Sequence, residues 1–126
     1  MVFKVMVVDD DLPTLEVMNL ILKKIGYEPV LYRNGLDALQ WLEQHCPDLI
    51  LLDLQMIPID GWEFLRRLRE DRSRSTIPVM LFTARPLLDQ ERAHADREVV
   101  KVLEKPVAPN ELKQELEEFF RKLGRM

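Results

Sequence analysis

Acidic, hydroxyl and lysine side chains stand in this sequence at the places where short apolar runs end. Asp9-Asp10-Asp11 follow the first apolar run, and Asp53 follows the third. Thr83 closes the fourth run, and Lys105 comes just after the fifth. In an open parallel α/β sheet, functional groups gather at the carboxyl ends of the strands, beside the point where the strand order reverses. We therefore expect these side chains to meet along one rim of a sheet.

Such a set of side chains is suited to phosphoryl chemistry. Hard divalent cations take oxygen ligands, and Mg²⁺ usually binds one or two carboxylates together with a phosphate. A bound cation also relieves the repulsion between clustered carboxylates and stabilises their ionised forms. One carboxylate could then act as a nucleophile and form an acyl phosphate. Because a lysine ammonium and a threonine hydroxyl would stabilise the phosphoryl oxygens, the set predicts a Mg²⁺-assisted phosphoryl site.

Short β-branched segments alternate along the chain with helical patterns, which is typical of βα units around a parallel sheet. The first, third and fourth strands are nearly continuous apolar runs, as expected for strands covered on both faces. Strands are predicted over residues 3–8, 28–32, 49–53, 78–83 and 99–103. Helices are predicted within residues 13–25, 35–45, 61–74, 86–98 and 112–123. The whole chain, residues 1–126, is predicted to form one α/β domain.

The fourth helical segment, residues 86–98, has the weakest pattern. Beyond Leu87, Leu88 and a few alanines, no apolar stripe continues along it. A helix that buries little apolar surface has low local stability. We expect this helix to be short, mobile or irregular.

The third helical segment ends in a run of arginines. Cations suit the negative pole of a helix dipole, so we interpret this run as a solvated helix end rather than an anion site. The residues are Arg66, Arg67, Arg69, Arg72 and Arg74.

Composition narrows the class of protein. Of the 126 residues, 47% are hydrophobic and 32% are charged, with 18 Lys and Arg against 22 Asp and Glu and a net charge of −4. That balance argues against a surface that coats nucleic acid, which would need a basic face. The single cysteine, Cys46, favours a reducing compartment, and neither a signal peptide nor a membrane-spanning stretch fits the sequence. A cytoplasmic protein with no direct nucleic acid or membrane contact is expected.

Five motifs, in this order, resemble the receiver domain of two-component response regulators, the CheY-like family. The resemblance covers essentially the whole chain and implies a doubly wound, flavodoxin-like sheet of five parallel strands in the order 2-1-3-4-5, with helices on both faces. It also implies a single receiver domain over 1–126 without an output domain. The motifs are Val7-Val8-Asp9-Asp10-Asp11, Leu51-Leu52-Asp53-Leu54-Gln55-Met56, Asp60-Gly61, Leu81-Phe82-Thr83-Ala84 and Glu104-Lys105-Pro106.

The resemblance assigns the central role to Asp53, which would accept a phosphoryl group from a histidine kinase or a phosphotransfer protein. Asp10, and Asp9 partly through water, would hold Mg²⁺ together with Asp53 and the backbone carbonyl of Gln55. The protein would catalyse its own phosphotransfer and dephosphorylation without being a turnover enzyme. It would signal through an output protein or through an effector domain of a longer chain.

The same resemblance implies how the signal is read. Lys105 would pair with Asp53 and then with its phosphate, and Thr83 would move to bond a phosphate oxygen. That movement would remodel the surface of the fourth helix, fifth strand and fifth helix, so residues 84–126 are the predicted partner or homodimer surface. Gln55 and Arg85, each two positions beyond a site residue, would tune access of the hydrolytic water.

Three positions depart from the family pattern. Ile57 stands where the family usually has a proline, and Pro58 follows one residue late, so the loop after Asp53 is expected to take a different path. Val102 replaces the family's switch aromatic. Arg97-Glu98 replace the usual Gly-Ala pair before the fifth strand. These departures leave the phosphorylation chemistry intact, but they change the residues through which the family usually passes the signal on.

Two other functions are weighed against the phosphorylated switch. The first is a pseudo-receiver, a binding module that keeps the fold without being phosphorylated. The second is a haloacid-dehalogenase-like phosphatase, because residues 9–14, Asp-Asp-Asp-Leu-Pro-Thr, loosely match its Asp-x-Asp nucleophile motif. That scheme leaves Asp53 without a role and lacks a late acidic motif. Phosphate found on Asp9 would support the phosphatase, and phosphate on Asp53 the receiver.

Overall fold

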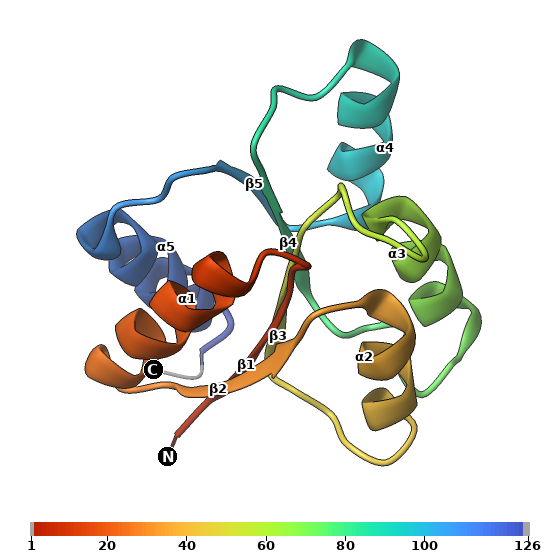
Figure 1. Cartoon of the computed structure of the whole chain (residues 1–126). Helices are drawn as coiled ribbons and strands as arrows, with labels where there is room; N and C mark the ends of the chain where they lie inside the picture. The colour runs from red at the N-terminus through yellow and green to blue at the C-terminus, as the bar shows by residue number, and fades with distance from the viewer. Residues whose placement is uncertain (1, 125–126) are drawn as a thin grey trace.

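The computed structural model describes residues 2–124, in which five strands alternate with five helices (Figure 1). None of the helices in this part of the chain is long and apolar enough to cross a membrane. In chain order the elements are β1 (Lys4–Val8), α1 (Leu12–Lys24), β2 (Glu28–Tyr32), α2 (Gly35–Leu42), β3 (Leu49–Leu52), α3 (Gly61–Glu70), β4 (Val79–Thr83), α4 (Asp89–Glu98), β5 (Lys101–Glu104) and α5 (Pro109–Lys122).

The strands form one parallel sheet in the order β2-β1-β3-β4-β5, which confirms the predicted doubly wound topology. β1 pairs with both β2 and β3, so the strand order reverses beside it. The register places Val8 opposite Leu52, and Thr83 opposite Glu104. The residues that follow these positions therefore leave the sheet at the same edge, where parallel α/β proteins carry their functional groups.

Two hydrophobic cores lie on opposite faces of the sheet, because successive side chains of a strand point to opposite sides. Val5 and Val7 of β1 pack with α1 and α5, while Met6 and Val8 pack with α2 and α3. Figure 1 shows α1 and α5 on one face and α2, α3 and α4 on the other. This two-sided burial explains the nearly continuous apolar runs of β1, β3 and β4.

The fourth helix is continuous over ten residues, which is the length of α3 and more than the eight of α2, although it occupies only part of the predicted segment 86–98. It begins at Asp89, so residues 86–88 stay outside it. Its N-cap, Leu88, has no side-chain oxygen to offer the helix amides. Within α4, all of which is described, Ala95 alone is buried. Few apolar contacts therefore hold α4 against the domain, which makes it one of the elements that move at low cost.

The interpretation of the arginine run as a solvated helix end is wrong for two of its members. α3 ends at Glu70, and the Arg69 guanidinium donates to the backbone carbonyls of Ser75, Ile77 and Glu98, at 3.0, 2.7 and 3.1 Å. Burial lowers the pKa of Arg69, although Glu98 opposes that shift. In the same way, Arg74 donates to the carbonyl of Leu39 at 3.2 Å. Glu98 and Leu39 belong to distant segments, and Ser75 and Ile77 lie in the loop after α3, so a helix pattern does not reveal these acceptors.

Replacing Arg69 with methionine is expected to lower the free energy of unfolding by about 2 to 3 kcal/mol, because the change strips charged donors from three carbonyls. Urea denaturation measures this loss. The matched control is Arg66→Met. The Arg66 side chain is 57% exposed and pairs with Glu63 on the helix surface. An exposed pair of that kind is worth at most about 1 kcal/mol. Equal losses in the two variants would contradict the structural role of Arg69.

Candidate functional site

The predicted carboxylate cluster assembles at the carboxyl edge of the sheet. Asp9 and Asp53 follow the neighbouring strands β1 and β3, and the Asp53 amide donates to the carbonyl of Val8 at 3.0 Å. Oxygens of Asp9, Asp10 and Asp53 all lie within 4.8 Å of one another. Asp9 and Asp53 are buried, whereas Asp10 is exposed. Three carboxylates thus face a common point that is reachable from solvent on the Asp10 side.

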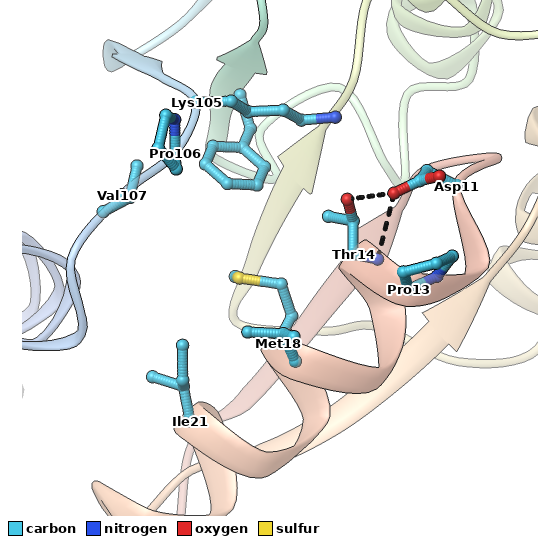
Figure 2. Close-up of a pocket in the computed structure, with 10 residues that line it drawn as sticks. Asp11, Pro13, Thr14, Met18, Ile21, Lys105, Pro106 and Val107 are labelled. Carbon is cyan, nitrogen blue, oxygen red and sulfur yellow. Dashed lines mark hydrogen bonds between the residues drawn. The ribbon is translucent and has the colours of Figure 1, made fainter.

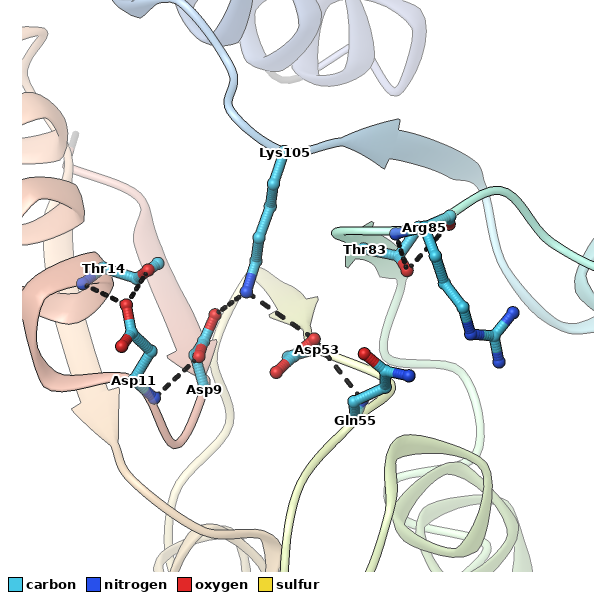
Figure 3. Close-up of polar contacts among 8 residues, drawn as sticks. All are labelled: Asp9, Asp11, Thr14, Asp53, Gln55, Thr83, Arg85 and Lys105. Atoms are coloured by element: carbon cyan, nitrogen blue, oxygen red, sulfur yellow. Dashed lines mark hydrogen bonds and ion pairs between the residues drawn. The ribbon is translucent and has the colours of Figure 1, made fainter.

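Lys105 reaches the same cluster from the loop after β5 (Figure 3). Its Nζ lies 2.5 Å from Asp9 Oδ2 and 3.6 Å from Asp53 Oδ1. The nearer partner is therefore Asp9, although the resemblance implies pairing with Asp53. The backbone amide of Lys105 donates to the carbonyl of Thr83 at 2.8 Å, which fixes the start of the loop. One ammonium group is thus shared by two buried carboxylates.

The surroundings of Asp53 disfavour its ionised form. Burial first, and then the negative charge of Asp9, shift the pKa of Asp53 upward, and its net value is about 6. Lys105 and the amide of Gln55, 3.4 Å from Asp53 Oδ1, act in the opposite direction. One lysine does not neutralise three carboxylates, so the site carries excess negative charge. Cation binding would offset that excess and favour the ionised carboxylate.

Asp11 stands apart from the cluster and caps α1. Its carboxylate accepts from the amide of Thr14 at 3.1 Å and from the Thr14 hydroxyl at 2.5 Å. These hydrogen bonds lower the pKa of Asp11. The Asp11 amide in turn donates to Asp9 Oδ1 at 2.9 Å. Asp11 is thus an N-cap that also helps to orient Asp9, rather than a member of the cluster.

The chain that leaves Asp53 is held tightly against the start of α3. The Gly61 amide donates to the carbonyl of Leu54 at 2.9 Å. A Cβ atom at Gly61 would lie 2.5 Å from the Asp53 carbonyl oxygen, so any larger residue would push this segment away. The glycine of the Asp60-Gly61 motif therefore positions Asp53. Farther along the loop, Ile57 is 76% exposed.

Thr83 is buried at the same edge, and its hydroxyl is bonded to the loop that follows β4. Oγ1 donates to the carbonyl of Arg85 at 3.1 Å and accepts from the Arg85 amide at 3.3 Å. The structure therefore places Thr83 beside the cluster with its single hydroxyl proton already donated. A bond from Thr83 to a phosphoryl oxygen would require this hydroxyl to leave the Arg85 carbonyl.

Glu91 is a residue of this region that the sequence analysis missed. The Arg85 guanidinium, which Figure 3 shows turned away from Asp53, pairs with both Glu91 oxygens at 2.7 and 2.8 Å. The indole nitrogen of Trp62 donates to the same carboxylate at 3.0 Å. The only available signal was an acidic residue three positions after Leu88, where a helix cap often has one.

An apolar pocket of about 280 Å³ adjoins the site (Figure 2). Met18 and Ile21 of α1 line one side, and Pro106 and Val107 line the other. Lys105 belongs to the pocket as well as to the carboxylate cluster. A molecule that approaches the cluster from this side therefore meets an apolar surface.

Comparison with known proteins relates this geometry to one family. Residues 5–117 match the model of the response regulator receiver domain. The polar-differentiation response regulator DivK of Brucella anthropi is 37% identical over 89 residues, which are 70% of this chain and 72% of DivK. The cyclic di-GMP phosphodiesterase response regulator RpfG of Xanthomonas campestris pv. campestris is 36% identical over 111 residues. That match covers 86% of this chain but only 29% of RpfG.

Solved structures agree with the fold. The N-terminal domain of a response regulator receiver protein from Methanoculleus marisnigri superposes with a TM-score of 0.80 at 33% identity, over 94% of this chain and 96% of that one. The receiver domain of the sensor histidine kinase PA1611 from Pseudomonas aeruginosa superposes with a TM-score of 0.86 at 23% identity. The match covers 96% of this chain and 99% of the PA1611 domain. The PA1611 structure has a magnesium ion coordinated in its active site cleft.

Proposed function

Since this chain belongs to the response regulator receiver domain family of two-component signalling, we propose that it is a switch activated by phosphorylation of Asp53. The phosphodonor is a histidine kinase or a phosphotransfer protein. The observation that carries the proposal is the meeting of three carboxylates within 4.8 Å, with the Lys105 ammonium at the same point. A further protein, or an effector domain of a longer chain, receives the signal.

The reaction is a transfer of one phosphoryl group to a carboxylate. An oxygen of ionised Asp53 attacks phosphorus, and a P–O bond forms while the bond from phosphorus to the donor nitrogen or oxygen breaks. The electron pair of that bond leaves with the donor, which takes up a proton. The Lys105 ammonium, 3.6 Å from Asp53, stabilises the charge on the transferred group. Attack of water on phosphorus later returns the carboxylate and releases inorganic phosphate.

The same residues fit Mg²⁺. Carboxylate oxygens are the ligands that this hard cation prefers, and the site has an excess of them. We assign Asp9, Asp10, Asp53 and the backbone carbonyl of Gln55 as the groups that would hold it. When bound, the ion supplies positive charge that neutralises the phosphoryl oxygens. Lys105 and Asp11 keep Asp9 oriented toward the cluster through both of its oxygens.

Intact mass after incubation with phosphoramidate and Mg²⁺ tests the proposal. We expect one added phosphoryl group in the parent protein and none in Asp53→Asn or in the presence of a chelator. Asp96→Asn, which changes an exposed carboxylate on α4, is the matched control and should be labelled like the parent. Loss of labelling in that control would show a general effect of the substitution.

Two results would overturn the proposal. If the folded protein gains no phosphoryl group from phosphoramidate or from histidine kinases, the chain is a pseudo-receiver that binds its partners without being phosphorylated. If labelling persists in Asp53→Asn and maps to Asp9, the acceptor is wrong and the phosphatase-like scheme gains support. The predicted homodimer through residues 84–126 has its own test, which is the sedimentation of the phosphorylated and unphosphorylated forms.

A further inference from the structure

The carboxylate of Glu91 is a meeting point for three segments of the domain. It accepts four hydrogen bonds, two from the Arg85 guanidinium, one from the Leu88 amide at 2.9 Å and one from the Trp62 indole. Arg85 belongs to the loop after β4, Leu88 caps α4, and Trp62 lies on α3. One side chain therefore ties the loop beside the predicted phosphorylation site to two helices.

The charge and burial of Glu91 make this junction persistent. Its side chain is 15% exposed, and the Arg85 side chain is 37% exposed. The hydrogen bond from Arg85, followed by those from Leu88 and Trp62, lowers the pKa of Glu91 to about 2. The carboxylate is therefore ionised throughout the physiological pH range. Bidentate pairs between arginine and carboxylate are among the stronger side-chain interactions. Because Glu91 stays ionised, a change of pH within this range does not open its pair with Arg85.

Arg85 links this junction to Thr83. Its backbone carbonyl and amide hold the Thr83 hydroxyl, while its guanidinium holds Glu91. The hydroxyl has a single proton, so Thr83 cannot donate to Arg85 and to a phosphoryl oxygen at once. A turn of the hydroxyl toward Asp53 would release the backbone of Arg85. Arg85, whose guanidinium pairs with Glu91, would then no longer be held by Thr83.

We propose that Thr83, Arg85, Glu91 and Trp62 form a relay that carries the phosphorylation state of Asp53 to α4 and α3. This inference rests on the proposed function and names how the same site is read. Before phosphorylation, Thr83 holds the Arg85 backbone, and Glu91 holds both Arg85 and Trp62. After phosphorylation, Thr83 bonds the phosphoryl group, the loop of residues 84–88 shifts, and the Arg85–Glu91 pair opens. Trp62 then loses its acceptor.

α4 is suited to respond to this event. Ala95 is its buried residue, and its helix start relies on the Glu91 carboxylate, which accepts from the Leu88 amide in place of a capping side chain. Besides the bond from Trp62 to Glu91 and the bond from Arg69 to the Glu98 carbonyl, α4 contacts α3 through the edge-on packing of His94 on Trp62, with ring centres 4.8 Å apart. Opening of the junction therefore loosens both the N-terminal turn of α4 and its neighbour on α3.

The fluorescence of Trp62 reports on the relay. The other tryptophan, Trp41, is removed by Trp41→Phe so that the emission comes from Trp62 alone. Phosphoramidate and Mg²⁺ are added, and the mass adduct is measured in the same sample. We expect the emission of Trp62 to shift in proportion to the phosphorylated fraction, because the indole loses its charged acceptor.

Three variants in the Trp41→Phe background separate the relay from a simple structural role. Glu91→Gln removes the charge that holds Arg85, so its emission before phosphorylation should already resemble the phosphorylated parent, and the phosphorylation-dependent shift should be lost. Thr83→Val removes the hydroxyl and should also lose the shift, whereas Thr83→Ser should restore it. Asp89→Asn removes an exposed charge from the same helical turn and should keep the full shift. Far-ultraviolet circular dichroism checks that each variant is folded.

The outcomes distinguish the relay from the function on which it rests. Absence of the mass adduct overturns the proposed function and the relay together. An adduct on Asp53 without any shift in Trp62 emission overturns the relay alone. A full shift in Glu91→Gln also overturns it, because the signal would then reach Trp62 by another route.

Discussion

Lys105→Met is expected to slow phosphoryl transfer to Asp53 roughly 10²- to 10³-fold, since loss of one group that stabilises developing charge has about this effect in enzymes. Lys105 contacts Asp9 and Asp53, and its side chain is only 17% exposed. Its removal also leaves two buried carboxylates without their cation, which lowers the unfolding temperature in the presence of a chelator. The initial rate of adduct formation, followed by intact mass, measures the first effect.

Lys101→Met is the control for this experiment. Lys101 lies at the start of β5, where it pairs with Glu115 and its side chain is 47% exposed. That variant should be phosphorylated at the parental rate. In Lys105→Met, added Mg²⁺ should recover part of the lost thermal stability, because a cation at the carboxylate cluster replaces the missing charge. Parental phosphorylation rates in Lys105→Met would contradict the role assigned to this residue.

Asp53→Asn is expected to make the metal-free protein more stable near neutral pH. The pKa of Asp53 is raised from 3.8 to about 6 in the folded protein. A carboxyl group whose pKa is raised on folding stabilises the folded protein at pH values below its unfolded-state pKa. This contribution is lost as the pH rises through its folded-state pKa. Between pH 4 and pH 7, the parent should therefore lose about 2 to 3 kcal/mol relative to Asp53→Asn. Urea denaturation with a chelator present measures the difference.

Mg²⁺ should reverse this difference at pH 7. A ligand that binds only the folded state raises its apparent stability, and the parent has one more carboxylate at the site than the variant. The gain should shrink below pH 6, because protons compete with the cation for Asp53. Asp96→Asn serves as the exposed control and should follow the parent at every pH. Parallel pH profiles for the parent and Asp53→Asn would show that Asp53 is not perturbed.

Most of the fold was predictable from the sequence for a local reason. Strands buried on both faces need continuous apolar runs, and helices need an apolar stripe, so both leave a pattern that can be read along the chain. The five predicted strands and helices are present, with ends shifted by a few residues. The strand order came from the resemblance to receiver domains, because local patterns do not specify which strands are neighbours.

The side chains that lie at the carboxyl edge of the sheet were also predictable. Asp9, Asp53 and Thr83 each stand at the end of an apolar run, and parallel strands end at a common edge. Lys105 follows β5 in the same way. The sequence indicated that these side chains would meet, but it did not indicate their pairing. The packed loop after β5 places Lys105 nearer to Asp9 than to Asp53.

The sequence by itself determined which chemical groups this protein brings to the edge of its sheet, because burial and chain direction are properties of each segment. Tertiary structure alone decided how those groups are held and connected. Arg69 binds carbonyls of the loop after α3 and of the end of α4, Gly61 leaves room for the Asp53 backbone, and Glu91 joins Arg85 to Trp62. Trp62 and Glu91, like Arg69 and Glu98, are 29 residues apart in sequence, and the other contacts join separate elements across a loop. Their meeting is set by the packing of the domain rather than by the pattern of any one element.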